Sequence, residues 1–133
     1  MKVRELFEKL DERQKKTVMG CRERCGIPNL DAEVNPEVPD DVVKFLKVIS
    51  NPLRLKILKL IRDEWLCVCL ISQALGEDQT LISHHIRSLK SLNLVLERRE
   101  GRMRFYKTNI EVVKGYLEAV RGELIHEEAP EGS

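Results

Sequence analysis

The chain lacks the features of a membrane-embedded or exported protein. Its longest apolar run is WLCVCLI at residues 65–71, far short of the roughly 18 residues that a membrane-spanning helix needs. The opening stretch, MKVRELFEKLDERQKK, is charged throughout and does not have the apolar centre of a signal peptide. We therefore expect an intracellular, cytoplasmic protein with no membrane partner.

The chain also lacks an excess of either charge. It has 23 Lys and Arg residues against 22 Asp and Glu residues, a net charge of +1, so any affinity for nucleic acid must come from a local basic patch. With 133 residues, 42% of them hydrophobic, the chain is long enough for one domain with a tail at each end.

Enzyme motifs are missing as well. There is no C-x-x-C, no H-E-x-x-H, no Gly-rich phosphate loop and no Ser-His-Asp grouping. We therefore expect no enzymatic activity, and a thiol enzyme is the weakest of the hypotheses. The chain does contain four cysteines. In a reducing compartment these favour metal or redox chemistry over structural disulfides.

The N-terminal segment, residues 1–38, reads as a helix followed by a linker. Apolar residues recur with helical spacing at Val3, Leu6, Phe7 and Leu10. This pattern predicts one amphipathic helix over residues 3–18, which must pack on something else. Gly20 and Gly26 then interrupt the pattern, and residues 27–39, with three prolines and little apolar content, predict a linker.

Residues 39–126 predict a mainly α-helical domain with one β-hairpin. The expected order is a helix from 40 to 50, a helix capped by Asn51, a short helix that ends at Gly76, a helix from 78 or 79 to 91, two strands that turn at Glu100 and Gly101, and a last helix capped by Asn109. The second of these helices places Leu55, Leu58 and Ile61, with Ile57, on one face. This order is that of a winged helix-turn-helix. Residues 127–133 predict a flexible acidic tail.

The helix after Gly76 carries the pattern of a DNA-recognition helix. Ile82, Ile86 and Leu89 form its apolar stripe, and the opposite face carries Thr80, Ser83, His84, Arg87 and Ser91. Short donors and an arginine suit base edges and phosphates in a major groove. Adjacent histidines on a helix point about 100° apart, so His84 and His85 do not form a chelating pair. We expect His84 to face DNA and His85 to border the core.

The predicted hairpin supplies the local basic patch. Its cations are Arg98, Arg99, Arg102, Arg104 and Lys107. Residues 78–107 hold seven Lys and Arg against three Asp and Glu, a local charge of +4 in a chain of +1. Negative charge gathers near the C-terminus instead. A merely solvated charged face is the alternative, but helix and hairpin together favour binding to double-stranded DNA.

The four cysteines fall into two pairs, Cys21-x₃-Cys25 and Cys67-x-Cys69. Cysteine is often simply buried as an inert side chain, but within the first pair the spacing lets both thiols meet one ion if the segment is a helix or turn, and no cysteine is left over. Four thiolates suit soft or borderline ions: Cd(II), Pb(II), Zn(II), Cu(I) or As(III).

From about Pro39 to His126 the chain resembles the ArsR/SmtB family of metal-responsive repressors. The stretch LCVCLISQALGEDQTLISHHIRSLKSLNLVLERREGRMRFYKTN is similar to that family's pattern of ELCVCDL, SHHL, GLV, R-x-EG and a later Tyr. One departure is Leu70, where the pattern has Asp, which implies the loss of a polar contact at a helix start. The resemblance implies a homodimer, held by the first core helix and the last, that represses metal-resistance or transport genes and leaves operator DNA when metal binds.

Within that family the cysteine pattern is similar to the cadmium- and lead-sensing CadC-type branch. The resemblance implies that Cys67 and Cys69 form the metal box. It also implies that the tail thiolates of Cys21 and Cys25 join them across the dimer, so that the regulatory ligand is a Cd, Pb, Zn or As(III) ion. Whether the two pairs meet within one chain or across the dimer stays open.

Two other sites of the family are incomplete in this sequence. Arsenite sensors often carry a third cysteine five positions after the first of the metal box, where this chain has Ser72. The family's zinc site on the last helix would begin at Ile110 and Val112, which do not ligate metals, although Glu123 and His126 match its second half. We therefore expect no zinc site there and solvent-facing side chains at both positions.

Two regulatory alternatives keep the DNA-binding domain. In one, the cysteine pairs oxidise and the protein is a thiol-redox-responsive regulator. In the other, the protein is a constitutive architectural DNA binder, which leaves the pairing of the cysteines unexplained.

Overall fold

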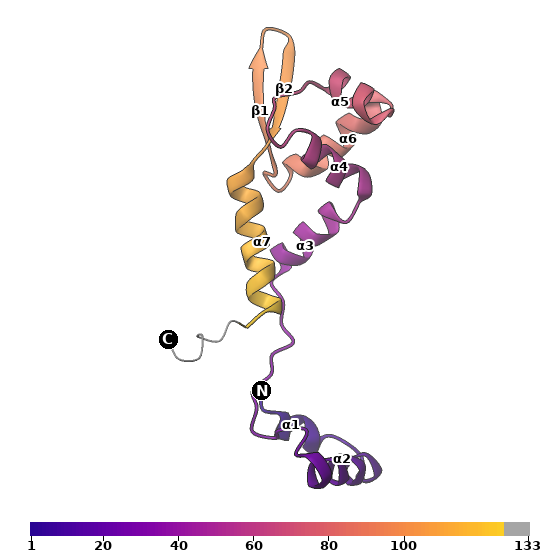
Figure 1. The fold of residues 1–133 in the computed structure, drawn as a ribbon, viewed down its shortest axis with the longest axis vertical. Coiled ribbons are helices and arrows are strands. Elements are labelled where there is room, and N and C mark those ends of the chain that lie inside the picture. Colours follow the sequence, from indigo (N-terminus) through magenta and orange to yellow (C-terminus); the bar gives the residue numbers. More distant parts are fainter. Residues whose placement is uncertain (127–133) are drawn as a thin grey trace. The chain divides into compact units, whose positions relative to one another are not determined.

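The structure, a computed structural model, describes residues 1–126; the acidic tail predicted over residues 127–133 lies outside them. The described elements are α1 (Val3–Glu8), α2 (Glu12–Cys25), α3 (Asp40–Ile49), α4 (Pro52–Leu60), α5 (Val68–Leu75), α6 (Gln79–Lys90), β1 (Val95–Glu100), β2 (Met103–Thr108) and α7 (Ile110–Leu124) (Figure 1). The chain divides into two compact units, here called the N-terminal unit (Met1–Glu37) and the winged unit (Val38–Ser133). Within residues 1–126 no helix has the length and apolar character to cross a membrane.

Local signals fix the helix boundaries in the winged unit. The Oδ1 atom of Asn51 accepts hydrogen bonds from the backbone N–H groups of Leu53 and Arg54, and Pro52 occupies the first turn of α4. Gly76 ends α5 with a left-handed φ of 65°, which glycine adopts without steric cost. These boundaries confirm the predicted starts and stops.

The wing is an antiparallel hairpin in which Val95 pairs with Thr108 and Glu100 with Met103. The two residues between the strands are therefore Gly101 and Arg102, one position later than predicted. Gly101 has a φ of 60°, as the first central residue of a type II′ turn requires, and such turns match the twist of paired strands.

The core of the winged unit joins all its helices to the wing. The side chains of Ile57, Ile61, Ile71, Ile82, Leu89 and Leu94 are fully buried in it. Phe45 of α3 stacks on Tyr116 of α7, with ring centroids 4.7 Å apart. The prediction that Leu55 shares the buried face of α4 is wrong, because its side chain is 54% exposed and lies on the side of α4 that the monomer leaves open.

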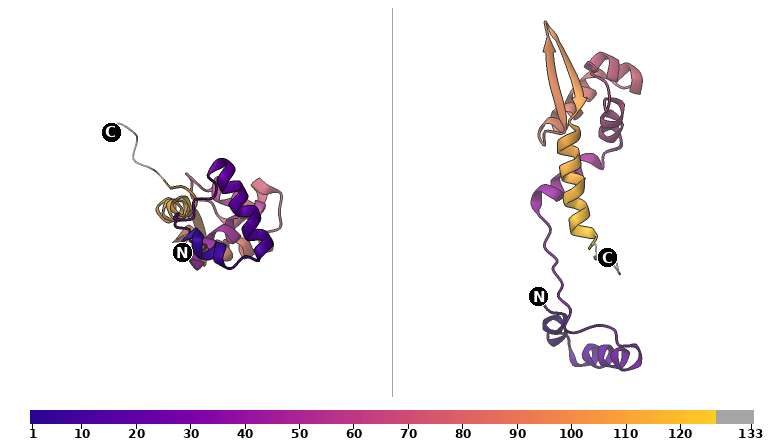
Figure 2. Two further views of the ribbon diagram at one scale, coloured as in Figure 1. Left: turned by 90° about the horizontal axis from the view of Figure 1, so that it is seen from below. Right: turned by 60° about the vertical axis from the view of Figure 1, so that its left-hand side comes forward.

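The elements of the winged unit have the winged helix-turn-helix arrangement predicted for them. Helix α5, a short turn and α6 form the helix-turn-helix, and β1 and β2 follow directly as the wing (Figure 1). A second view shows the hairpin projecting beyond one end of α7, which runs back alongside α3 (Figure 2). The protein is thus mainly α with a β-hairpin wing.

The prediction of one helix over residues 3–18 in the N-terminal unit is wrong. Helix α1 ends at Glu8, and a new helix, α2, starts at Glu12 and runs through Gly20 to Cys25. The break has a local cause: the Asp11 side chain accepts from the Gln14 N–H at 2.7 Å, and the Gln14 side chain accepts from the Asp11 N–H at 3.2 Å. This capping box specifies a helix start directly after Leu10, the last residue of the apolar stripe that predicts a single helix.

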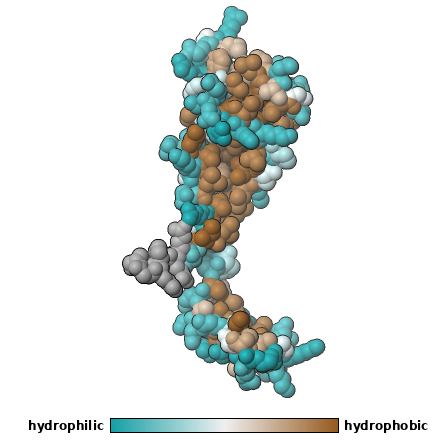
Figure 3. All heavy atoms as spheres, viewed as in Figure 1, coloured by the Kyte–Doolittle hydropathy of each residue, from teal (hydrophilic) through white to brown (hydrophobic). Residues whose placement is uncertain are grey.

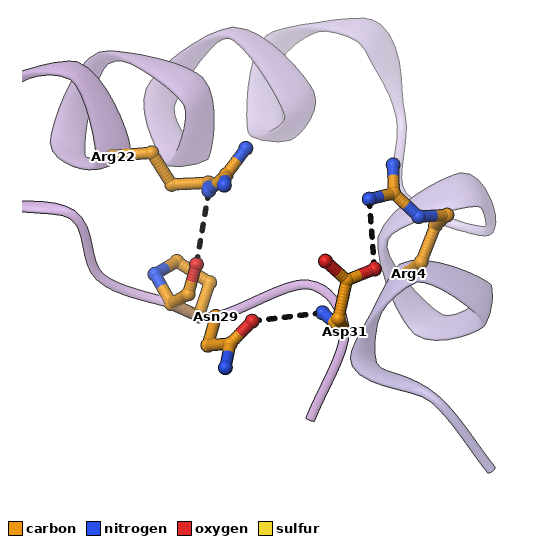
Figure 4. Close-up of polar contacts among 5 residues, drawn as sticks. Arg4, Arg22, Asn29 and Asp31 are labelled. Atoms are coloured by element: carbon orange, nitrogen blue, oxygen red, sulfur yellow. Dashed lines mark hydrogen bonds and ion pairs between the residues drawn. The ribbon is translucent and has the colours of Figure 1, made fainter. Parts of the chain in front are cut away.

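Part of the predicted linker belongs to the fold of the N-terminal unit. Leu30 is buried, and the backbone N–H of Arg4 donates to its carbonyl oxygen at 2.9 Å. Side chains add three contacts (Figure 4): Arg4 Nη2 lies 3.1 Å from Asp31 Oδ1, Arg22 Nε donates to the carbonyl of Pro28 at 3.0 Å, and Asn29 Oδ1 accepts from the Asp31 N–H at 3.0 Å. The segment after α2 therefore folds back onto both helices instead of leaving them.

Candidate nucleic-acid interface and thiol site

Helix α6 has the two faces that the sequence predicts. Ile82, Ile86 and Leu89 are buried. On the opposite side Thr80, His84, Arg87 and Ser91 are exposed and Ser83 is half-buried. The hydroxyl of Ser91, the C-cap residue of α6, donates to the carbonyl oxygen of Ser88 at 2.6 Å. This side chain therefore also satisfies a carbonyl group at the C-terminal end of the helix. That these residues contact DNA stays a prediction.

The two adjacent histidines lie in different environments, as predicted. His84 is exposed, whereas His85 is 7% exposed. Arg54 Nε, from α4, donates to His85 Nδ1 at 3.0 Å. Burial lowers the pKa of His85, and the charges of Arg54 and His84 lower it further. His85 is therefore a neutral acceptor that orients Arg54. The residue spacing within α4 does not predict this contact, because its partner lies on α6.

The arginines of the wing do not share one face. Because side chains alternate along a strand, the strand register places Arg99 and Arg104 opposite each other on the same face as Glu97 and Tyr106. Arg98 lies on the other face, where its Nε lies 2.8 Å from a carboxylate oxygen of Glu100. Like charges opposite each other destabilise a strand pair, and an anion such as a DNA phosphate would relieve that repulsion. Arg102 is exposed in the turn.

A pair of thiols opens α5. Cys67 is the residue that caps the helix, and Cys69 lies in its first turn, with the two Sγ atoms 3.5 Å apart. Cys67 is 5% exposed and Cys69 is exposed. A tetrahedral ion with metal–sulfur bonds of about 2.3 Å holds its sulfur ligands about 3.8 Å apart, so this pair fits two positions of such an ion with a shift of a few tenths of an ångström.

The two thiols differ in acidity. Burial raises the pKa of Cys67, but the backbone N–H of Leu70 and the thiol of Cys69 stabilise its thiolate, and the net pKa is lowered. The pKa of Cys69 is raised, because its thiol donates to Cys67 and its own charge would face the Cys67 thiolate. The first proton therefore leaves Cys67, and thiolate is the form that binds metal. Leu70 itself is exposed, and α5 has no acidic residue in its first turn.

The other thiol pair lies on consecutive turns of α2. The Cys25 thiol donates to the carbonyl oxygen of Cys21 at 3.2 Å, and Arg24 Nη2 lies 3.3 Å from Cys21 Sγ. Cys25 is exposed and Cys21 half-buried. This pair belongs to the N-terminal unit and the first pair to the winged unit.

No cluster of three or more His, Cys, Asp or Glu side chains within residues 1–126 is arranged to hold a metal ion. Each of the two predicted thiol pairs, taken within its own unit, thus supplies fewer ligands than a full set. Ile110 and Val112 of α7 cannot ligate, and both Glu123 in its last turn and His126 beyond its end are exposed, as predicted.

Comparison with known proteins identifies relatives of the winged unit. The sequence profile of the family described as bacterial regulatory protein, arsR family, matches residues 51–96. The chain is 36% identical over 81 residues to a cadmium resistance transcriptional regulatory protein CadC homolog of Staphylococcus aureus, covering 60% of this chain and 67% of the relative. It is 39% identical over 67 residues to an arsenical resistance operon repressor of Staphylococcus xylosus, covering 50% of this chain and 64% of that one.

A solved structure supports the same relationship. The fold is similar to a homodimeric winged helix-turn-helix DNA-binding domain from Mycobacterium bovis, a possible ArsR-family transcriptional regulator, with 30% identity and a TM-score of 0.53. The match covers 68% of this chain and 88% of the other. The relatives named in these comparisons are thus regulators of transcription.

Proposed function

The chain belongs to the arsR family of bacterial regulatory proteins, and on that premise we propose that it is a homodimeric repressor that releases operator DNA when a soft metal ion binds its cysteine thiolates. The observation that carries the proposal is the pair of sulfur atoms, 3.5 Å apart, at the start of the helix-turn-helix. Relatives named for cadmium and arsenical resistance support a soft or borderline ion. A repressor acts where the DNA is, so the proposal places the protein in the cytoplasm.

The proposed DNA contacts come from α6 and the wing. Thr80, Ser83, His84, Arg87 and Ser91 would enter the major groove. Arg99, Arg102 and Arg104 would neutralise backbone phosphates, which supplies affinity without sequence specificity. Arg98 has a smaller part in this proposal, because Glu100 already pairs with it on the far face of the hairpin.

Homodimerisation is proposed through the apolar face shared by α3 and α7. Val43, Leu46 and Leu117 are between 36% and 49% exposed on these helices, and Leu55 borders a cavity of about 350 Å³ beside them. Apolar residues dominate the visible face of the winged unit over these elements (Figure 3). Contiguous apolar patches of this kind mark interaction sites, and the relative from Mycobacterium bovis is homodimeric.

The proposed ion is bound by Cys67 and Cys69, with Cys21 and Cys25 completing its ligands. Four thiolates form a complete set for Cd(II), Pb(II) or Zn(II), and three of them suffice for As(III). The missing third cysteine at Ser72 makes arsenite the weakest candidate. When bound, the ion supplies a link between thiolates that are otherwise separate. Cys67, which ionises first, would be the entry ligand.

One observation favours a second candidate, a thiol-redox regulator. Sulfur atoms 3.5 Å apart are close enough to be joined by an oxidant after small movements, since a disulfide bond is about 2.05 Å long. In that case oxidation, and not metal, would release DNA.

One titration separates the candidates. Reduced protein is bound to a duplex selected from random-sequence DNA, and Cd(II), Pb(II), Zn(II) or arsenite is added while thiolate-to-metal absorption and DNA release are followed together. We expect release at one ion per protomer, accompanied by proton release. If a mild oxidant released the DNA and none of the four ions did, the redox function would replace the metal response.

A further inference from the structure

A continuous set of contacts leads from Cys67 to the DNA-binding face of the winged unit. Leu66, the residue before Cys67, pairs with Tyr106 of β2 through two backbone hydrogen bonds: the Leu66 N–H donates to the Tyr106 carbonyl at 3.0 Å, and the Tyr106 N–H donates to the Leu66 carbonyl at 2.8 Å. This isolated bridge attaches the start of the thiol segment to the wing. The backbone next to Cys67 is therefore hydrogen-bonded directly to the backbone of β2.

The side chain of Tyr106 extends the connection across the hairpin to the recognition helix. Its hydroxyl donates to Glu97 Oε1 at 3.0 Å, and Lys90 Nζ of α6 lies 3.3 Å from the same oxygen. The tyrosine is only 6% exposed, so its ring is held by packing. One carboxylate oxygen thus joins the wing strand that touches the thiol segment to the last turn of α6.

Two of these residues, Lys90 and Tyr106, also line a polar hollow of about 260 Å³. Val68, between the two thiols, lines it together with Ser83 and Arg87 of α6 and with Arg104 and Tyr106 of β2. Val68, which lies between both proposed metal ligands, therefore borders the same space as three proposed DNA contacts, Ser83, Arg87 and Arg104. A shift at the start of α5 changes the shape of this hollow directly.

We propose that Tyr106, through its bridge to Leu66 and its hydrogen bond to Glu97, is the positioning residue that couples ion binding at Cys67 and Cys69 to the placement of α6 and the wing. This inference rests on the proposed function. An ion that draws Cys67 toward other thiolates moves Leu66 and, with it, Tyr106. The hydroxyl then pulls Glu97 and Lys90 to a position in which α6 and the wing no longer fit one DNA site together.

The test removes a single hydroxyl. Tyr106→Phe keeps the ring and the backbone bridge and removes the hydroxyl, which hydrogen-bonds Glu97 and also contacts the side chain of Arg104. Tyr116→Phe is the matched control, because Tyr116 is a half-buried tyrosine of α7 whose ring stacks on Phe45. For wild type and both variants, DNA affinity is measured with and without Cd(II), and Cd(II) affinity is measured by thiolate-to-metal absorption.

Wild type and Tyr116→Phe should lose DNA affinity on cadmium addition by a factor in the usual allosteric range, about 5- to 150-fold. Tyr106→Phe should bind Cd(II) and, without metal, DNA within about threefold of wild type, while its cadmium-induced loss falls to less than about a third of the wild-type factor. Glu97→Gln, which keeps an acceptor and removes the charge that attracts Lys90, should give an intermediate factor. It also serves as the deciding variant if Tyr106→Phe does not fold.

An unchanged factor in Tyr106→Phe would overturn the inference and leave the proposed function standing. A loss of DNA affinity that is equal with and without cadmium would also overturn it, because the hydroxyl would then only hold the wing in place. If wild type itself did not respond to any of the four ions, the proposed function would fail and this inference with it.

Discussion

The N-terminal unit and the winged unit are held together in different ways. Among the residues the structure describes, Leu30 is the one buried side chain of the N-terminal unit, whereas a contiguous apolar core joins every element of the winged unit. Exposed contacts supplement Leu30, such as the pair of Arg4 and Asp31, in which the two side chains are 53% and 71% exposed. Exposed ion pairs contribute about 0–1 kcal/mol each, so the N-terminal unit is the less stable of the two.

This difference places the two thiol pairs in different settings. Cys67 and Cys69 start a helix that is anchored by Ile71 in the main core, so their separation is set before an ion arrives. Cys21 and Cys25 belong to a helix with no buried residue of its own. Part of the binding free energy of an ion there is therefore used to order the unit. Under the proposed function, the first pair would transmit the metal signal and the second would adjust the affinity for the ion.

The largest effect on stability should come from truncating a buried side chain of the winged unit, compared with the same truncation in the N-terminal unit. Ile82→Ala removes a fully buried side chain and should destabilise the winged unit by about 2–5 kcal/mol, or roughly 8 °C or more in its melting temperature. Leu30→Ala should leave that transition unchanged and increase amide hydrogen exchange in residues 1–37 only. Calorimetry and exchange measure the two effects. Equal shifts of the main transition in both variants would mean that the units unfold together.

The next effect concerns the two thiol pairs. Cys67→Ser should abolish the cadmium-induced loss of DNA affinity, a coupling of about 1–3 kcal/mol, and should spare DNA binding without metal. Cys25→Ser should weaken cadmium binding and keep part of the response, because the pair in the winged unit remains. Electrophoretic mobility shift with and without Cd(II) measures both. If Cys67→Ser lost DNA affinity with cadmium as the wild type does, the two thiol pairs would not differ in function as proposed.

Basic residues provide a third, smaller contrast. Replacing Arg99 and Arg104 together with Ala should reduce the slope of DNA affinity against salt concentration by about one unit for each phosphate that is no longer neutralised. Arg98→Ala, on the other face of the hairpin, should change the slope less, and Arg13→Ala in the N-terminal unit should not change it. Fluorescence anisotropy at several salt concentrations measures the slopes. A large effect of Arg13→Ala would bring the N-terminal unit into the DNA interface.

The smallest expected effect is a dependence of stability on pH. The pKa of His85 is lowered in the folded protein, so below the unfolded value of about 6.5 the unfolded chain takes up the proton first. The stability of the winged unit should therefore fall, by on the order of 1 kcal/mol or less, as the pH is lowered from 7 to 5. The N-terminal unit contains no histidine and should not respond over this range.

Urea denaturation at several pH values measures this dependence. His85→Gln should flatten it. Replacing the exposed neighbour His84 by Gln removes one of the charges that lower the pKa of His85 and should therefore reduce the dependence only in part. An equally steep dependence in His85→Gln would assign the proton uptake to a different group.

Sequence patterns predict the winged unit well because its signals are local and agree with one another. The stripe of Ile82, Ile86 and Leu89, the cap at Asn51 and the stop at Gly76 each occur where the fold needs them. In the N-terminal unit the apolar stripe ends at Leu10, and the Asp11 capping box starts a new helix directly after it. The capping box determines the helix boundary because a single continuous helix would gain little stabilisation from apolar burial in this unit.

Sequence alone determined which residue types are available: two pairs of thiols, a basic hairpin, and a helix with one polar face. Tertiary structure decided how they are combined. It set the 3.5 Å between Cys67 and Cys69, turned Arg98 away from Arg99, tied Arg54 to His85 and connected Leu66 through Tyr106 to Glu97 and Lys90. Periodicity reports which side of one element faces the core, and it carries no information on which residue of a distant element lies opposite. That information arises only when the packed core fixes the elements against each other.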